Sequence, residues 1–156
     1  MKTLVIFGSR RGTTKKCAEI MQETCKNECT LLDVKSKRKL NISEFERIII
    51  GANAFSGKLN PLVRKYVRKN ISILLKKELF LFICCGSTEK ETVDALFLSC
   101  YPLEIINHAK LKENFGGCLK FHEESYIIRT ILKKMGKQDY DTVSNKESIV
   151  QWMVSL

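Results

Sequence analysis

The feature that most constrains the fold of this chain is an apolar run followed at once by a polar, glycine-containing loop. Residues 2–7 have the sequence KTLVIF, which is typical of a strand covered on both faces of a parallel sheet. Residues 8–14 have the sequence GSRRGTT. Gly8 and Gly12 allow a tight turn with inward-pointing N–H groups, Ser and Thr side chains offer hydroxyl donors, and a helix start adds partial positive charge. The pattern predicts a phosphate-binding turn between the first strand and the first helix.

Three other phosphate-related motifs do not match the residues of this turn. The Walker pattern GxxxxGK[ST] does not match, because no Lys-Ser or Lys-Thr follows Gly12, and the dinucleotide fingerprint GxGxxG is absent. A phospho-receiver domain would need an acidic cluster after the first strand and an Asp at the end of the third, where this chain has Ser9, Arg10 and Gly51. A phosphorylated cofactor is therefore the guest that we expect.

Strand-like and helix-like patterns alternate along the rest of the chain. We expect strands at residues 2–7, 30–34, 47–51, 78–85 and 115–121, and helices at residues 13–27, 61–76, 92–100, 125–135 and 146–154. This alternation predicts a doubly wound parallel α/β sheet, with the most apolar strand, 78–85, in its middle. Ligands of such sheets bind beyond the carboxyl ends of the strands, which directs attention to loops 8–14, 52–60, 86–91 and the one after 121.

Composition supports one folded domain over residues 1–156. Hydrophobic residues make up 44% of the chain and charged residues 28%, which argues against disorder. No run approaches the roughly 20 apolar residues of a membrane span, and no signal peptide is evident, so we expect a cytoplasmic protein.

The seven cysteines favour free thiols over a disulfide framework or a metal site. Their number is odd, no CxxC pair occurs and there are only two histidines, so we predict no bound metal. Cys84 and Cys85 are interpreted as buried strand thiols, because neighbouring strand residues face opposite sides. Cys25 and Cys29, one helical turn apart, are interpreted as partly buried thiols.

Basic residues outnumber acidic ones, 27 to 17, and the net charge is +10. This balance favours anionic partners but is also common on soluble surfaces. A basic helix face has two interpretations, a solvated surface or a docking site for an acidic redox partner or an anionic membrane; it comprises Arg64, Lys65, Arg68, Lys69, Lys76 and Lys77. No interleaved aromatic residues support nucleic-acid binding, and none is expected.

The loop at residues 9–14, SRRGTT, resembles the S/T-x-T-G-x-T phosphate loop of flavodoxins, which hold FMN. Arg11 stands where that family usually has a threonine, so a hydroxyl donor is lost; its guanidinium could bind phosphate instead or point to solvent. The resemblance implies a flavodoxin-like three-layer sandwich, a five-stranded parallel sheet in the order 2-1-3-4-5 with helices on both faces. It also implies an FMN-binding electron-transfer flavoprotein.

The resemblance assigns candidate residues to FMN. The phosphate would be bound by Ser9, Arg10, Arg11, Gly12, Thr13 and Thr14. One side of the flavin ring would meet Asn53, Ala54, Phe55, Ser56 and Gly57, with Phe55 stacking unless it folds onto the core, and the other side Cys85, Gly86, Ser87 and Thr88. Gly57 corresponds to the peptide that flavodoxins reorient toward flavin N5. His122, after the fifth expected strand, is either a proton-transfer residue or simply exposed.

A narrower resemblance suggests an enzyme. Ile50-Gly51-Ala52, then Phe55-Ser56-Gly57 and a basic helix, are similar to the flavodoxin-type, quinone-linked protoporphyrinogen oxidases, in which cations such as Lys58 or Arg129 would hold a carboxylated tetrapyrrole. Three hypotheses follow: an FMN electron carrier serving a redox protein, small molecule or quinone; an FMN-dependent oxidoreductase of that enzyme type; or a flavin-free interaction module using its basic face. Positive surroundings would make the second reduction step of a bound flavin less negative than in an acidic flavodoxin.

Overall fold

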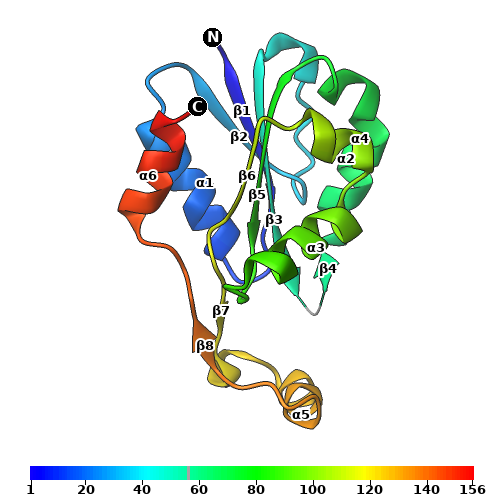
Figure 1. Cartoon of the computed structure of the whole chain (residues 1–156), viewed down its shortest axis with the longest axis vertical. Helices are drawn as coiled ribbons and strands as arrows, with labels where there is room; N and C mark the ends of the chain where they lie inside the picture. Colours follow the sequence, from blue (N-terminus) through cyan, green and yellow to red (C-terminus); the bar gives the residue numbers. More distant parts are fainter. Residues whose placement is uncertain (56) are drawn as a thin grey trace.

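The computed structural model describes residues 1–55 and 57–156, with Phe55 as backbone only, and shows a parallel sheet between two helical layers (Figure 1). The parallel strands lie in the order β2-β1-β3-β5-β6. Their bounds are β1 (Thr3–Gly8), β2 (Cys29–Asp33), β3 (Arg47–Phe55), β5 (Glu78–Cys84) and β6 (Leu111–Asn114). Counted along the chain as five strands, this is the predicted order 2-1-3-4-5. The predicted fold is therefore confirmed, although β3, and not the most apolar strand β5, is central.

Helices cover both faces of the sheet. The helices α1 (Thr13–Thr24) and α6 (Lys146–Val154) lie on one face, and α2 (Pro61–Leu74), α3 (Lys90–Cys100) and α4 (Leu103–His108) on the other (Figure 1). The Asn60 side chain accepts a hydrogen bond from the Leu62 N–H, so it caps α2, whose first residue is Pro61.

The core follows from the alternation of side chains along the buried strands. Leu4 and Ile6 of β1 pack in the cluster under α2, whereas Val5 and Phe7 join the cluster under α1 and α6. The ring of Trp152 from α6 meets Phe80 and Phe115 edge-on, with centroids 6.3 and 5.5 Å away. The strands β1, β3 and β5 thus contribute buried side chains to both cores, which keeps their carboxyl ends fixed.

The fifth strand was predicted in the wrong place. Residues 115–121 were expected to form it, but Leu111–Asn114 pairs with β5, while β7 (Cys118–Leu119) pairs antiparallel with β8 (Tyr140–Asp141) in a separate two-stranded sheet. The sequence LKEN is polar because β6 is an edge strand with water on its open side. The apolar Phe115 is buried as a loop residue against Phe82 and Trp152.

Several shorter elements escape the periodic patterns. β3 continues past the expected end, and β4 (Lys58–Leu59) returns antiparallel beside it. Two 3-10 turns, η1 (Ile42–Glu44) and η2 (Phe121–Glu123), and the short helix α4 are also present. Helix α5 (Tyr126–Lys134) begins after Ser125, which caps it, and lies with β7 and β8 beyond the carboxyl ends of the main strands (Figure 1).

Candidate functional site

Two adjoining cavities lie at the carboxyl edge of the sheet. The smaller has a volume of about 30 Å³ and is lined by Ser9, Arg10, Arg11, Thr13, Thr14, Asn53, Ala54, Cys84, Gly117, Cys118 and Tyr140. The larger has a volume of about 350 Å³ and is lined by Ala54, Gly57, Cys85, Gly86, Ser87, Thr92, Leu96, Lys137 and Tyr140. Because Ala54 and Tyr140 border both, the two cavities form one site with a small polar end and a larger end of ligand-pocket size.

The turn after β1 shapes the small cavity. Gly12 immediately precedes α1 with φ +96°, a conformation that side-chain-bearing residues rarely adopt, and its N–H donates to Ser9 Oγ at 3.0 Å. Thr14 is fully buried, and its hydroxyl has no oxygen or nitrogen partner among the described residues; it lies beside the Cys84 thiol, whose raised pKa it opposes. A buried hydroxyl without a partner is costly unless a ligand engages it. The turn therefore fits a phosphate group.

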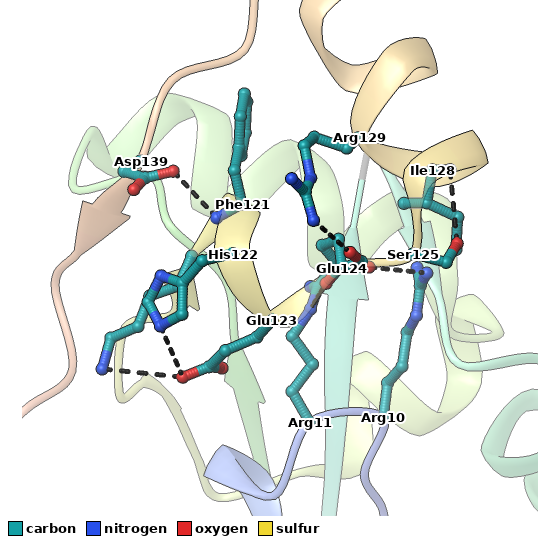
Figure 2. A network of polar contacts seen from close by, with 11 residues as sticks. Arg10, Arg11, Phe121, His122, Glu123, Glu124, Ser125, Ile128, Arg129 and Asp139 are labelled. Atoms are coloured by element: carbon teal, nitrogen blue, oxygen red, sulfur yellow. Dashed lines mark hydrogen bonds and ion pairs between the residues drawn. The ribbon is translucent and has the colours of Figure 1, made fainter.

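Arg11, which stands where flavodoxins usually have a threonine, does not point to solvent. Arg11 and Arg10 both reach Glu124, which follows η2 (Figure 2). The Glu124 side chain is only 7% exposed, and Arg10 Nη2 lies 3.8 Å from its Oε2 while Arg11 Nε donates to Oε1. Arg129 Nη2 adds a hydrogen bond to the Glu124 carbonyl oxygen at 3.1 Å. Arg11 thus faces a buried carboxylate at the rim of the small cavity, not solvent.

The loop at residues 85–87 is fixed by one side chain from the edge strand. Asn114 Oδ1 accepts hydrogen bonds from the N–H groups of Cys85 and Gly116, each at 3.1 Å, and Asn114 Nδ2 donates to Ser87 O at 2.8 Å. The larger cavity therefore has a preformed wall. Asn114 escaped the sequence analysis because the strand that carries it was placed wrongly.

Tyr140 packs against this loop and lines both cavities. A Cβ atom on Gly86 would lie 2.3 Å from Tyr140 Cε2, so only glycine permits this contact. Burial raises the pKa of the Tyr140 hydroxyl, although the Arg11 charge opposes the shift. Sequence reasoning missed Tyr140; the one available signal was an aromatic residue within a stretch that is otherwise polar.

The structure brings together most of the residues assigned to FMN. Those lining the small cavity are Ser9, Arg10, Arg11, Thr13, Thr14, Asn53 and Ala54, and those lining the larger one are Ala54, Gly57, Cys85, Gly86 and Ser87. Thr88 instead lines a neighbouring groove with Asn114. Ser56 and the side chain of Phe55 lie outside the described residues. His122 lines neither cavity and is 75% exposed, with Nε2 3.8 Å from Glu123 Oε1.

The sequence pattern of the Flavodoxin domain family matches residues 4–145, which include both cavities. The chain belongs to the flavodoxin domain family. No curated protein sequence matches it. The turn after β1, the β3–β4 hairpin, the 85–87 loop and the β7–β8 segment that carries Tyr140 all lie within this flavodoxin domain.

Solved structures share the flavodoxin fold at low sequence identity. Oxidised flavodoxin 1 from Bacillus cereus superposes with a TM-score of 0.63 at 16% identity, over 99% of this chain and 95% of that one. General stress protein 14 from Treponema denticola in complex with FMN gives 0.53 at 12% identity, over 99% of both chains. A flavoprotein from Lactobacillus acidophilus in complex with FMN gives 0.51 at 16% identity, over 74% of this chain and 91% of that one.

The cysteines of this flavodoxin domain are free thiols. Cys84 and Cys85 are buried, as predicted, and Cys84 Sγ lies 3.9 Å from Cys17 Sγ. Burial and the neighbouring Cys25 raise the pKa of Cys29 to about 12. The described residues contain no cluster of side chains suited to a metal ion, and none of their helices is long and apolar enough to cross a bilayer.

Proposed function

We propose that this flavodoxin-domain protein binds FMN and transfers electrons. The observation that carries the proposal is the buried Thr14 hydroxyl, which has no oxygen or nitrogen partner among the described residues and lines a cavity beside the Gly12 turn that adjoins the larger one. Family membership and the FMN named for two similar structures support the same ligand. FMN has one phosphate and one ring system, which correspond to the small and the large end of the site.

Each part of the site has a separate task in this proposal. The N–H groups and hydroxyls of the turn bind the phosphate, helped by the amino-terminal end of α1. The β3–β4 hairpin and the 85–87 loop enclose the ring, and Tyr140 covers it from the side of β8. When bound, the flavin supplies the redox chemistry. The protein positions the ring, limits its contact with water and sets the local charge, with Lys137 at the larger cavity as a cation.

The partner surface is proposed to be the basic face of α2. Arg64, Lys65, Arg68 and Lys69 are exposed along this helix, as the sequence predicted, while Val63 and Val67 are buried beneath it. Such a face attracts an acidic electron-transfer protein and speeds encounter at low salt. A small molecule or quinone that enters the larger cavity is the other acceptor consistent with this site.

Removing the Thr14 hydroxyl tests FMN binding at this site. Thr14→Val should weaken FMN binding about tenfold to a hundredfold, because a hydrogen bond to a charged phosphate oxygen is lost. Riboflavin, which lacks the phosphate, should bind the variant as it binds the parent. Thr24→Val, at the far end of α1, is the matched control. Fluorescence titration of both ligands measures the effect; no FMN binding by the parent, or equal loss of both ligands, would contradict the proposal.

The protoporphyrinogen oxidase hypothesis stays a prediction. Of its two named cations, Lys58 is exposed on the β3–β4 hairpin, whereas the Arg129 guanidinium donates to the Glu124 carbonyl oxygen. FMN-loaded protein assayed with protoporphyrinogen and a quinone separates the enzyme from the electron carrier. Protein that is colourless and takes up no added FMN would support the flavin-free module.

A further inference from the structure

Helix α5 exposes an unusual amount of apolar surface. Of the twelve exposed large apolar side chains among the described residues, four belong to this helix or its carboxyl end. They are Tyr126, Ile127, Ile131 and Met135, with exposed fractions of 80, 71, 51 and 52%. Leu132 on the inner side is buried and attaches the helix to the protein. A stable soluble fold gains nothing from presenting this surface to water.

The exposed residues form an apolar stripe that Lys134 borders, while Lys133 lies on the other side of the helix. Ile127, Ile131 and Met135 are spaced by four, so they lie along one side of the helix. Lys133 and Lys134 are exposed in its last turn, and α5 contains no acidic residue. The helix is at one extreme of the long axis, where it projects beyond β7 and β8 (Figure 1). The apolar stripe is therefore presented at the tip of the molecule.

We propose that α5 docks on an anionic membrane surface, with Ile127, Ile131 and Met135 in the headgroup region and Lys134 beside them on a lipid phosphate. An apolar stripe with lysine at its border is the pattern of helices that lie in a membrane interface. The net charge of +10 adds long-range attraction to anionic lipids. A projecting tip favours a deformable lipid surface, because a protein partner would need a matching groove. The inference goes beyond the proposed function and does not depend on FMN binding.

Vesicle binding of the full chain tests the proposal. The protein should sediment with vesicles of phosphatidylcholine and phosphatidylserine, much less with phosphatidylcholine alone, and less as salt rises. The double variant Ile127→Ser/Ile131→Ser should bind at least about tenfold more weakly, because two apolar side chains leave the interface. The matched control is Leu98→Ser/Leu103→Ser, which removes two side chains that are 60 and 59% exposed on α3 and α4 and should not change binding.

A charge variant and a fluorescent variant make the assignment specific. Lys133→Ala/Lys134→Ala should weaken binding to the anionic vesicles, whereas Lys65→Ala/Lys69→Ala on α2 should weaken it less. Ile131→Trp should show a blue shift in emission when vesicles are added, because position 131 enters the interface. Circular dichroism confirms that each variant is folded, and FMN titration of the Ser variants separates a failure of this proposal from a failure of the proposed function.

Other outcomes would overturn the proposal. These are no vesicle binding by the parent protein, an equal loss in the Leu98/Leu103 control, or no loss in the Ile127/Ile131 variant. A dimer that dissociates in the Ile127/Ile131 variant without lipid would assign the stripe to a second copy of the chain. A complex with a defined acidic protein that the same variant abolishes, in the absence of vesicle binding, would assign it to that protein.

Discussion

Arg10 and Arg11 place two positive charges beside the phosphate turn, and Glu124 offsets part of that charge before any ligand binds. The carboxylate is buried and is reached by both guanidinium groups (Figure 2). A buried charge needs a partner of opposite sign, and here the Glu124 carboxylate and the two guanidinium groups are partners of one another. Under the proposed function Arg11 would compensate for the absent threonine through charge, and its contact with Glu124 ties the turn to the segment that carries Tyr140.

Cys118 offers a direct test of where the phosphate lies. Its half-buried thiol lines the small cavity, and burial raises its pKa, so its alkylation should accelerate with pH as the thiolate forms. FMN at about ten times its Kd should slow this alkylation about tenfold by covering the thiol. Cys25, half-buried at the far end of α1, should react at an unchanged rate. Mass spectrometry of both sites measures the difference; equal rates for Cys118 with and without FMN would argue against this placement.

The segment from β7 to β8 is an element that the main sheet does not require. Two backbone hydrogen bonds link the chain just before β7 with the chain just after β8. The Thr142 N–H donates to Gly117 O at 2.8 Å, and the Ser144 N–H donates to Phe115 O at 2.9 Å. Farther out, Glu124 joins the segment to the phosphate turn. Besides its buried Leu119 and Leu132, the segment is held by a few polar contacts, and its opening should be local and not global.

Removing the Glu124 charge should loosen this segment. Glu124→Gln leaves the arginines without their carboxylate, so we expect a loss of about 1–3 kcal/mol in unfolding free energy and faster amide exchange over residues 120–139. Glu123→Gln is the matched control. The Glu123 side chain neighbours Glu124 but is half exposed, so its substitution should change stability by less than about 0.5 kcal/mol. Urea denaturation and hydrogen exchange measure both effects. Similar behaviour of the two variants would show that the contacts of Glu124 are unimportant.

Glu78 lies at the amino-terminal end of β5, opposite the candidate site, and its protonation should lower the stability of the protein in acid. Burial alone would raise the pKa of this carboxyl, but hydrogen bonds from Lys110 and Arg47, at 2.6 and 2.8 Å, lower it overall. A lowered folded-state pKa contributes stability above the unfolded value of about 4.3, and this contribution is lost as pH falls through the folded value.

Glu78→Gln should therefore cost about 1 kcal/mol at neutral pH and flatten the decline in stability below about pH 5. Glu104→Gln, on the exposed side of α4, should preserve the slope of the parent protein. Urea midpoints measured between neutral and acid pH test this, and parallel curves for the parent and Glu78→Gln would rule it out.

The elements that could be predicted from the sequence are those whose burial dictates their composition. β1, β5 and the inner face of α2 are buried, so their side chains must be apolar and the pattern is visible in the sequence. The Asn60 cap is a hydrogen bond between residues close in sequence, so it also follows from local sequence. β6 and β8 could not be predicted, because an edge strand and an isolated ribbon tolerate polar side chains. The turn after β1 was recognisable as a candidate phosphate site because its glycine and hydroxyls are adjacent in sequence. Asn114 and Tyr140 were not, because only tertiary contacts bring them to the site.

The charge of the whole molecule should set the potential of the bound flavin. With net charge +10 and Lys137 at the larger cavity, electron uptake that adds negative charge is favoured. We expect the second reduction step to be less negative than in an acidic flavodoxin. Lys137→Gln should shift it to more negative values by on the order of tens of millivolts, and Lys69→Gln on α2 should shift it much less. Potentiometric titration decides; a second step as low as in an acidic flavodoxin would refute the prediction.

The position of Tyr140 has a consequence for how such proteins diversify. The phosphate turn belongs to β1 and α1, in the core of the fold, whereas Tyr140 and Lys137 belong to a peripheral segment beyond the sheet. Substitutions or length changes in that segment can alter the flavin's environment and its access to acceptors without disturbing the five-stranded core. Under the proposed function, exchanging residues 118–141 between flavodoxin-domain proteins should exchange part of the flavin's surroundings and leave the core intact.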